Sequence, residues 1–223
     1  MNIVLPSIQI ETKDHPTHSI IWMHGLGADG NDFVPIINEL KLLPDTAARF
    51  IFPHAPELAV SINNGYVMRA WYDILDPSMG NVEDEAGIRH SQAAICALIE
   101  QETQRGILPK NIILAGFSQG GVMALQVGLR YKKEIGGIIA LSCYLPLPYT
   151  LEAEISHANR NIPIFMVHGK QDAVIPISRA EESREKLRQS GYTIEWHEYD
   201  MEHSVCVKEI LDISEWLNLR FKQ

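Results

Sequence analysis

The sequence has few cysteines, and their spacing suits neither disulfides nor a metal. Cys96, Cys143 and Cys206 are odd in number and lie far apart, with no C-x-x-C pair among them. A disulfide framework uses an even set of cysteines, and structural zinc sites use closely spaced pairs of ligands. No two histidines have the spacing of H-E-x-x-H. We therefore expect no disulfide, no metal site, and a reducing, cytoplasmic compartment.

Positive charge and long apolar runs are also scarce. The chain has 19 lysines and arginines against 28 aspartates and glutamates, a net charge of −9. A general nucleic-acid binder needs a basic stripe, and attachment to anionic lipid needs a basic patch, so neither partner is expected. No apolar run is long enough to span a bilayer, and the first residues lack the basic and apolar segments of a signal peptide. We expect no stable membrane insertion.

The composition that remains is typical of one globular domain. The chain has 223 residues, 46% of them apolar, which is enough to bury a sizeable core. No internal repeat, low-complexity tract or linker divides it. We therefore expect a single domain over residues 1–223, and the oligomeric state stays open.

Hydrophobic patterning alternates strands with helices along the chain. Strands are expected at SIQIET, HSIIWMHG, ARFIFPHAP, NIILAGF, GGIIALSCYLP, NIPIFMVHG and, near a sheet edge, TIEWHEY; helices at 31–43, 81–106, 119–132, 176–189 and 205–221. Asn81 and Asp84 resemble a cap pair for the second helix. Residues 56–80 look irregular, with a turn at Asn63-Asn64-Gly65. The alternation predicts an α/β fold with a mostly parallel sheet covered on both faces.

One strand end carries a serine between glycines. Gly116-Phe117-Ser118-Gln119-Gly120 fits the G-x-S-x-G nucleophile elbow, which holds a serine hydroxyl above the end of a sheet. The turn is too tight for side chains at the two glycines, and the helix that follows favours negative charge beside the serine. The same residues also fit an ordinary small-residue turn. The motif alone therefore marks Ser118 only as a candidate nucleophile.

A serine of this kind needs a histidine to take its proton and a carboxylate to orient that histidine. In this type of fold the order along the chain is Ser, then Asp or Glu, then His. Asp172 follows the strand NIPIFMVHG, and His203 lies in the loop before the last helix. Asp172 alone would also fit an Asx-turn or a helix cap. Asp200 and Glu202 compete for the acid role, but they lie too close to His203 in sequence to reach round its ring.

Acyl transfer also needs two backbone N–H groups that bind the oxyanion. One belongs to the residue after the nucleophile, Gln119, and the other usually comes from an early strand-end loop. That loop is WMHGLGADGNDF here, where flanking glycines allow the Leu26 amide to turn inward. The loop lacks both the phosphate-loop and the dinucleotide fingerprints, so we expect no nucleotide and no cofactor. Four features in the required order at strand ends favour triad catalysis.

Several blocks of the sequence together resemble one known family. HGLGADGNDF, PELAVSINNGYVMRAWYDI, GFSQGG, LSCYLPL, HGKQDAVIP and MEHSV are similar to blocks of the carboxylesterase/acyl-protein thioesterase family, also labelled phospholipase/carboxylesterase, and they cover nearly the whole chain. The resemblance implies an α/β-hydrolase fold with little or no lid. It also implies Ser118, Asp172 and His203 as the triad, and Leu26 and Gln119 as the oxyanion amides.

The same resemblance suggests where the acyl group binds. It places residues 56–80 across the mouth of the site, with Trp71, Leu75 and Leu145 as part of an apolar acyl channel; simple core packing is the alternative for these three. Cys143 stands where the family usually has glycine. A small buried apolar side chain is its simplest role, and its effect on the pocket stays open.

The implied activity is that of a serine ester hydrolase. The implied substrates are carboxyl esters and thioesters, among them acylated small molecules, lysophospholipids and proteins with S-acylated cysteines. Two alternatives remain. A serine peptidase on the same fold would need extra domains or caps, for which 223 residues leave little room. A non-catalytic binding protein would have no need of the nucleophile, acid, base and oxyanion loop together.

Overall fold

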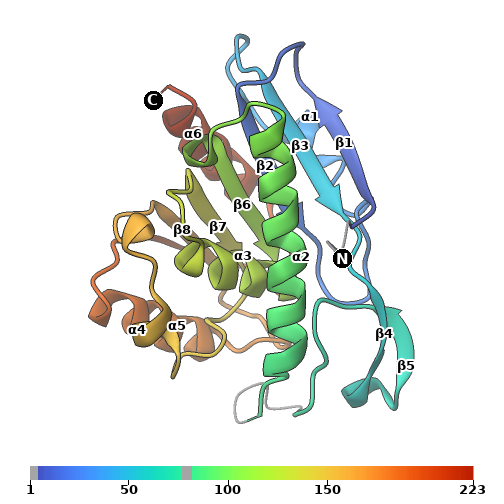
Figure 1. The fold of residues 1–223 in the computed structure, drawn as a ribbon. Coiled ribbons are helices and arrows are strands. Elements are labelled where there is room, and N and C mark those ends of the chain that lie inside the picture. The colour runs from blue at the N-terminus through green and yellow to red at the C-terminus, as the bar shows by residue number, and fades with distance from the viewer. Residues whose placement is uncertain (1–4, 77–81, 223) are drawn as a thin grey trace.

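A seven-stranded sheet forms the centre of the protein in the computed structural model, which describes residues 5–76 and 82–222 (Figure 1). The strand order is β1-β3-β2-β6-β7-β8-β9. The strands are β1 (Ser7–Glu11), β2 (His18–Met23), β3 (Ala48–Pro53), β6 (Ile112–Phe117), β7 (Gly137–Leu141), β8 (Ile164–Gly169) and β9 (Ile194–Tyr199). Only β1 pairs antiparallel, with β3. The predicted mostly parallel sheet and the edge position of TIEWHEY are confirmed.

Helices cover both faces of this sheet. On one face lie α2 (Glu85–Gln104), α3 (Gln119–Arg130) and α5 (Ile177–Gln189), whose apolar side chains share a core cluster with β6. On the other face lie α1 (Ile36–Glu39) and α6 (Val207–Arg220). Figure 1 shows α2 and α3 in front of the sheet and α6 behind it. Within residues 5–76 and 82–222, no helix is long and apolar enough to cross a membrane.

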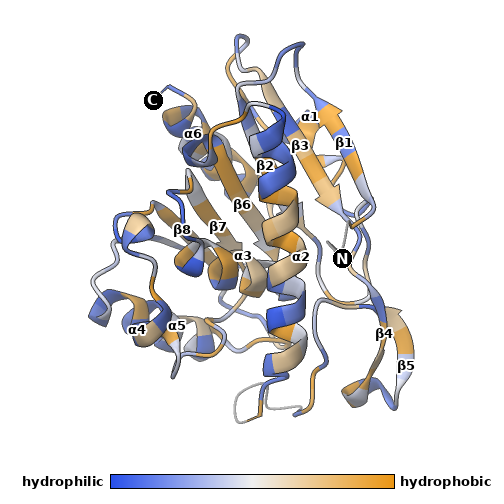
Figure 2. Ribbon diagram, in the orientation of Figure 1, coloured by the Kyte–Doolittle hydropathy of each residue, from blue (hydrophilic) through white to orange (hydrophobic). Residues whose placement is uncertain are grey.

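The central strands are apolar on both sides because both faces are covered. Every residue of β7 and β8 is buried, and so are five of the six residues in β2 and in β6. Figure 2 shows these strands as mostly orange, whereas the helices in front of them mix orange, pale and blue residues. The continuous apolar runs in the sequence therefore indicate strands that are buried on both faces. The alternating pattern of β9 indicates a strand at the edge of the sheet.

Two predicted helix boundaries differ in the structure. The helix expected over 31–43 shrinks to α1, a single four-residue turn with Pro35 at its N-cap and no capping side chain. Proline lacks an N–H and cannot stand inside a helix, so the apolar periodicity before it does not become helical. The helix expected over 81–106 begins at Glu85, where the Asp84 carboxylate accepts from the Gly87 N–H. Asn81 lies outside the described residues.

The segment expected to be irregular, 56–80, contains a hairpin. Strands β4 (Glu57–Val60) and β5 (Tyr66–Arg69) pair antiparallel as a separate two-stranded sheet. The predicted turn is confirmed: Asn64 and Gly65 have φ of 54° and 75°, in the left-handed region. The hairpin lies beyond the arrowhead of β3, at the end of the sheet where the parallel strands stop (Figure 1). It therefore belongs to the same end of the molecule as Ser118.

Candidate active site

Ser118 occupies a strained corner between β6 and α3. Its φ of 54° and ψ of −123° are rare for a residue with a side chain, and it is 8% exposed. A Cβ on Gly116 would lie 2.2 Å from the carbonyl carbon of Gly120, and one on Gly120 would lie 2.1 Å from the carbonyl oxygen of Met23. Both distances are far below van der Waals contact, so the turn requires glycine at both positions, as the motif predicted.

Ser118 opens onto an apolar cleft of about 480 Å³ at the carboxyl ends of the strands. Its polar lining is confined to a few groups, among them Ser118, Gln119 and His203. The rest of the lining is mainly aliphatic and aromatic: Leu26, Ala28, Ile62, Tyr72, Ile74, Phe117, Tyr144, Val174 and Ile175. A cleft of this kind suits a hydrocarbon chain placed beside a hydroxyl and an imidazole.

Asp172 holds the ring of His203 in the cleft. Asp172 Oδ2 lies 2.7 Å from His203 Nδ1, while Oδ1 accepts from the backbone N–H groups of Val174 and Ile175 at 2.9 and 2.8 Å. The carboxylate is buried, and the His203 ring packs on Phe117 with centroids 4.7 Å apart. A hydrogen on Nδ1 completes the contact with the carboxylate and leaves Nε2 as the basic nitrogen.

The competing carboxylates do not contact His203. Asp200 is largely exposed, and its carboxylate lies 3.1 Å from Lys170 Nζ. Glu202 is exposed as well. Their closeness in sequence works against them, because a side chain three residues or fewer from His203 in this tight loop points elsewhere. Among the described residues, Asp172 is the carboxylate bonded to His203.

A second histidine, His168, supports the same carboxylate. It is fully buried at the end of β8, its Nε2 donates to the Ile175 carbonyl at 2.8 Å, and the same nitrogen lies 3.3 Å from Asp172 Oδ2. Burial lowers the pKa of His168, so the ring is neutral at physiological pH. It therefore fixes both the acid and the loop that follows. The His-Gly pair at the strand end was the only sign of this in the sequence.

Two residues of the cleft lining have backbone N–H groups without acceptors in the described part of the chain. Leu26 and Gln119 both line it, and within residues 5–76 and 82–222 neither N–H donates to a protein acceptor. For Gln119 this follows from its place at the first turn of α3, where backbone donors have no partner within the helix. Two free donors beside a serine hydroxyl are the arrangement that binds an oxyanion.

The side chain of Gln119 ties the nucleophile turn to the chain that follows the hairpin. Its Oε1 accepts from the Trp71 N–H at 3.0 Å, and its Nε2 donates to the Tyr72 carbonyl at 2.9 Å. The Trp71 indole N–H in turn donates to the His24 carbonyl at 2.9 Å, at the start of the loop that holds Leu26. One buried network thus positions both free N–H groups. The sequence predicted a role only for the backbone N–H of Gln119, and it gave no sign of these side-chain hydrogen bonds.

Replacing Gln119 with alanine is expected to destabilise the protein. The change leaves the Trp71 N–H and the Tyr72 carbonyl buried without partners, at a cost of about 1–3 kcal/mol each. We expect the free energy of unfolding to fall by about 2–6 kcal/mol and Tm to fall by about 4–24 °C, measured by thermal unfolding. Gln189→Ala, at an exposed glutamine of α5, is the control. An unchanged Tm for Gln119→Ala would show that the network carries no stability.

The three side chains expected in the acyl channel do not line the cleft. Trp71 is 1% exposed and directs its indole N–H toward the His24 backbone, Leu75 is 46% exposed, and Leu145 lines a separate hollow of about 110 Å³. The hairpin and the loop after Asp172 provide other residues instead, such as Ile62 and Val174. Sequence spacing could not show which side of each segment faces the cleft.

Cys143 is a buried side chain in contact with α3. It is 1% exposed, and its Sγ lies 2.8 Å from where a Cβ on Gly121 would stand. Burial raises the pKa of this thiol, so it stays protonated. The expected role as a small apolar side chain is confirmed, and Cys143 is not part of the cleft lining.

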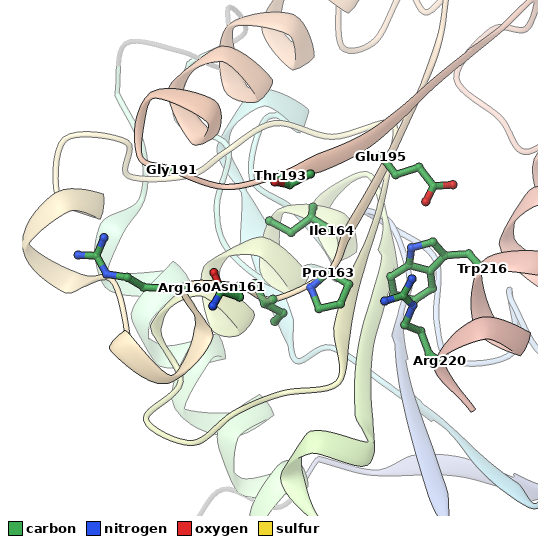
Figure 3. Close-up of a pocket in the computed structure, with 10 residues that line it drawn as sticks. Arg160, Asn161, Pro163, Ile164, Gly191, Thr193, Glu195, Trp216 and Arg220 are labelled. Atoms are coloured by element: carbon green, nitrogen blue, oxygen red, sulfur yellow. The ribbon is translucent and has the colours of Figure 1, made fainter. Parts of the chain in front are cut away.

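Another hollow lies where β8 and β9 begin, at the opposite end of the strands (Figure 3). Its lining includes Arg160, Glu195 and the stacked pair Trp216 and Arg220, with the guanidinium carbon 5.1 Å from the indole centroid. No serine, cysteine or histidine among the described residues lines it, so it does not hold a serine–histidine or cysteine–histidine pair. Across the described part of the chain, no cluster of three or more His, Cys, Asp or Glu side chains is arranged to hold a metal ion.

Comparisons with known proteins identify the family of this chain. A family model described as Phospholipase/Carboxylesterase matches residues 6–221. Acyl-protein thioesterase 1 of Gibberella zeae is 37% identical over 211 residues, 90% of this chain and 89% of that protein. Acyl-protein thioesterase 1 of Yarrowia lipolytica is 33% identical over 223 residues, 98% of each chain. The crystal structure of Arabidopsis thaliana SOBER1 has a TM-score of 0.86 at 32% identity, covering 91% of this chain and 98% of that chain. The chain therefore belongs to the phospholipase/carboxylesterase family of α/β hydrolases, and it is a serine hydrolase of esters or thioesters.

Proposed function

We propose that the cleft hydrolyses acyl esters and thioesters in two steps, with Ser118 as nucleophile, His203 as general base and Asp172 as the carboxylate that orients it. The observation that carries the proposal is the 2.7 Å contact between Asp172 and His203 at the edge of a cleft that also holds Ser118. Two backbone N–H groups on its other oxygen hold this buried carboxylate in a fixed orientation, as an orienting acid requires.

In the first step Ser118 Oγ attacks the substrate carbonyl while His203 Nε2 takes the hydroxyl proton. The imidazolium that forms is stabilised by Asp172 through Nδ1–H. Negative charge develops on the carbonyl oxygen, and the free N–H groups of Leu26 and Gln119 bind it. The tetrahedral intermediate collapses to an acyl-serine. His203 protonates a departing alcohol, whereas a thiol departs as the thiolate, and His203 then releases its proton to the thiolate or to solvent before the second step.

In the second step water replaces the leaving group. His203 removes a proton from the water, whose oxygen attacks the acyl-serine, and the same two N–H groups bind the second oxyanion. Collapse returns the proton to Ser118 and releases the carboxylic acid. All steps use groups of the chain and water, so the mechanism requires no cofactor.

The substrate class follows from the lining of the cleft. About 480 Å³ of mostly apolar lining beside Ser118 suits an aliphatic acyl group. Relatives of this chain are named acyl-protein thioesterase 1. We therefore assign proteins with S-acylated cysteines as the favoured substrates, and lysophospholipids and smaller acyl esters as further ones, met in the cytoplasm.

A panel of acyl chains tests this substrate class. p-Nitrophenyl esters from acetyl to palmitoyl are compared with an S-palmitoylated peptide, with kcat/KM measured for each. We expect kcat/KM to rise with chain length until the cleft is filled, by at most about fourfold per methylene, because a buried methylene contributes about 0.8 kcal/mol. The thioester peptide is expected to be hydrolysed as well. Indifference to chain length would rule out an acyl site in the cleft, and an intact peptide would rule out S-acylated proteins as substrates.

A further inference from the structure

Two tyrosine hydroxyls interrupt the apolar lining of the cleft. Tyr72 and Tyr144 both line it, they are 2% and 4% exposed, and their hydroxyl oxygens lie 3.1 Å apart. Tyr72 belongs to the segment after the hairpin, and Tyr144 follows β7. If the cleft bound only a plain hydrocarbon chain, aliphatic side chains at positions 72 and 144 would be sufficient. The hydroxyls therefore need a separate explanation.

Counting donors shows that this pair is incomplete. In a hydrogen bond between two hydroxyls, one O–H donates and the other oxygen accepts. The accepting tyrosine keeps its own O–H, and within residues 5–76 and 82–222 neither hydroxyl has any other partner. A buried donor without an acceptor is costly, and such groups in folded proteins are usually satisfied by water or ligand. The pair thus has one donor left over at the cleft.

A carboxylate oxygen near the pair also lacks a partner. Glu83 Oε2 accepts from the Leu147 N–H at 3.0 Å, but Glu83 Oε1 is buried without a hydrogen bond. Burial raises the pKa of Tyr72 and of Tyr144, and the nearby Glu83 carboxyl acts in the same direction, so both hydroxyls stay protonated donors. The spare donor thus belongs to the cleft lining, whereas the spare acceptor, Glu83 Oε1, belongs to the small neighbouring hollow.

Tyr144 separates the cleft from the small hollow behind it. That hollow of about 110 Å³ is lined by Glu83 and Arg179, and the Arg179 guanidinium carbon lies 5.0 Å from the Tyr144 ring centroid. A ligand chain in the cleft that reaches Tyr144 thus meets the boundary between apolar and charged surroundings. A hydroxyl is the small group that can both accept from the spare O–H and donate in return.

We propose that the cleft selects acyl groups that carry a hydroxyl along the chain, bound by the Tyr72–Tyr144 pair. The proposal rests on the proposed function, because it specifies the acyl group that is presented to Ser118. A site built to hydrogen-bond a ligand hydroxyl discriminates against the ligand without it, since the site's own polar groups are then left unpaired. A saturated chain still fits but leaves the spare donor unsatisfied.

Binding of free acids tests the proposal without requiring turnover. Dodecanoic acid and its monohydroxylated isomers, one for each carbon position, are titrated calorimetrically into Ser118→Ala. We expect one isomer, or two neighbouring ones, to bind at least about tenfold more tightly than dodecanoic acid, the gain of one to two buried hydrogen bonds. Adding both Tyr72→Phe and Tyr144→Phe should reduce this preference to less than about twofold while affinity for dodecanoic acid is kept, because removing both partners of a hydroxyl pair is nearly neutral.

A matched control and the wild-type enzyme separate the outcomes. Tyr131→Phe removes a tyrosine hydroxyl that bonds Glu100 away from the cleft, and it should leave the preference intact. The proposal is overturned if no isomer binds more tightly than dodecanoic acid, or if the preference survives loss of both hydroxyls. If either of these results is found while the wild type hydrolyses plain esters, the hydroxyl site is refuted and the proposed function stands. If the wild type does not hydrolyse plain esters, the proposed function is refuted instead.

Discussion

Ser118→Ala is expected to lower kcat for p-nitrophenyl ester hydrolysis by about 10⁴–10⁶-fold, the loss seen when a triad nucleophile is removed. In the proposed mechanism the Ser118 hydroxyl, in the cleft lining, is the group that becomes covalently acylated. The residual rate should come from the free N–H groups and substrate binding alone. Loss of the hydroxyl should leave the fold intact, because Ser118 Oγ makes no hydrogen bond in the described structure.

A fluorophosphonate probe separates loss of the nucleophile from loss of the fold. Wild type should be labelled at Ser118, and Ser118→Ala should not be labelled while its Tm stays within a few degrees of wild type. Ser190→Ala, at the C-cap of α5 with its hydroxyl on the Lys186 carbonyl, is the control that should keep label and rate. An unlabelled wild type, or equal rates for wild type and Ser118→Ala, would rule out serine catalysis.

The sequence predicted those parts of the fold and site whose residues are dictated by local geometry. The elbow is one example, because backbone contacts within 2.2 Å of a Cβ at Gly116 or Gly120 leave only one residue type. The central strands are another, since burial on both faces demands unbroken apolar runs. The place of Asp172 could be predicted in the same way. It follows the end of β8, which lies two strands from β6, the strand that precedes Ser118.

What depends on tertiary contact could not be predicted in this way. The β4–β5 hairpin has only four residues in each strand, too few for a clear alternation. The orientation of Trp71 depends on a hydrogen bond to the His24 carbonyl, 47 positions away in the sequence. The sequence alone therefore could not predict that Trp71 is buried. The same applies to the Gln119 side chain, whose partners belong to another segment.

Asp172→Asn is expected to cause the second large loss of activity. It should lower kcat by about 10⁴-fold at neutral pH while leaving the fold intact. The amide oxygen can keep the backbone bonds from Val174 and Ile175, which places the amide NH₂ toward His203 Nδ1. That nitrogen must then accept, so the ring proton moves to Nε2, and the base that faces Ser118 is lost.

The assignment of the acid can be tested against Asp200, which lies in the same loop as His203. Asp200→Asn changes an exposed carboxylate paired with Lys170, and it should alter kcat by less than about twofold, since exposed ion pairs contribute little. A rate loss in Asp200→Asn equal to that in Asp172→Asn would reverse the assignment. Asp172→Asn should also react slowly with the fluorophosphonate probe, because the serine is present but not activated. Normal labelling of Asp172→Asn would mean that the histidine works without its carboxylate, and the 2.7 Å contact would then be structural only.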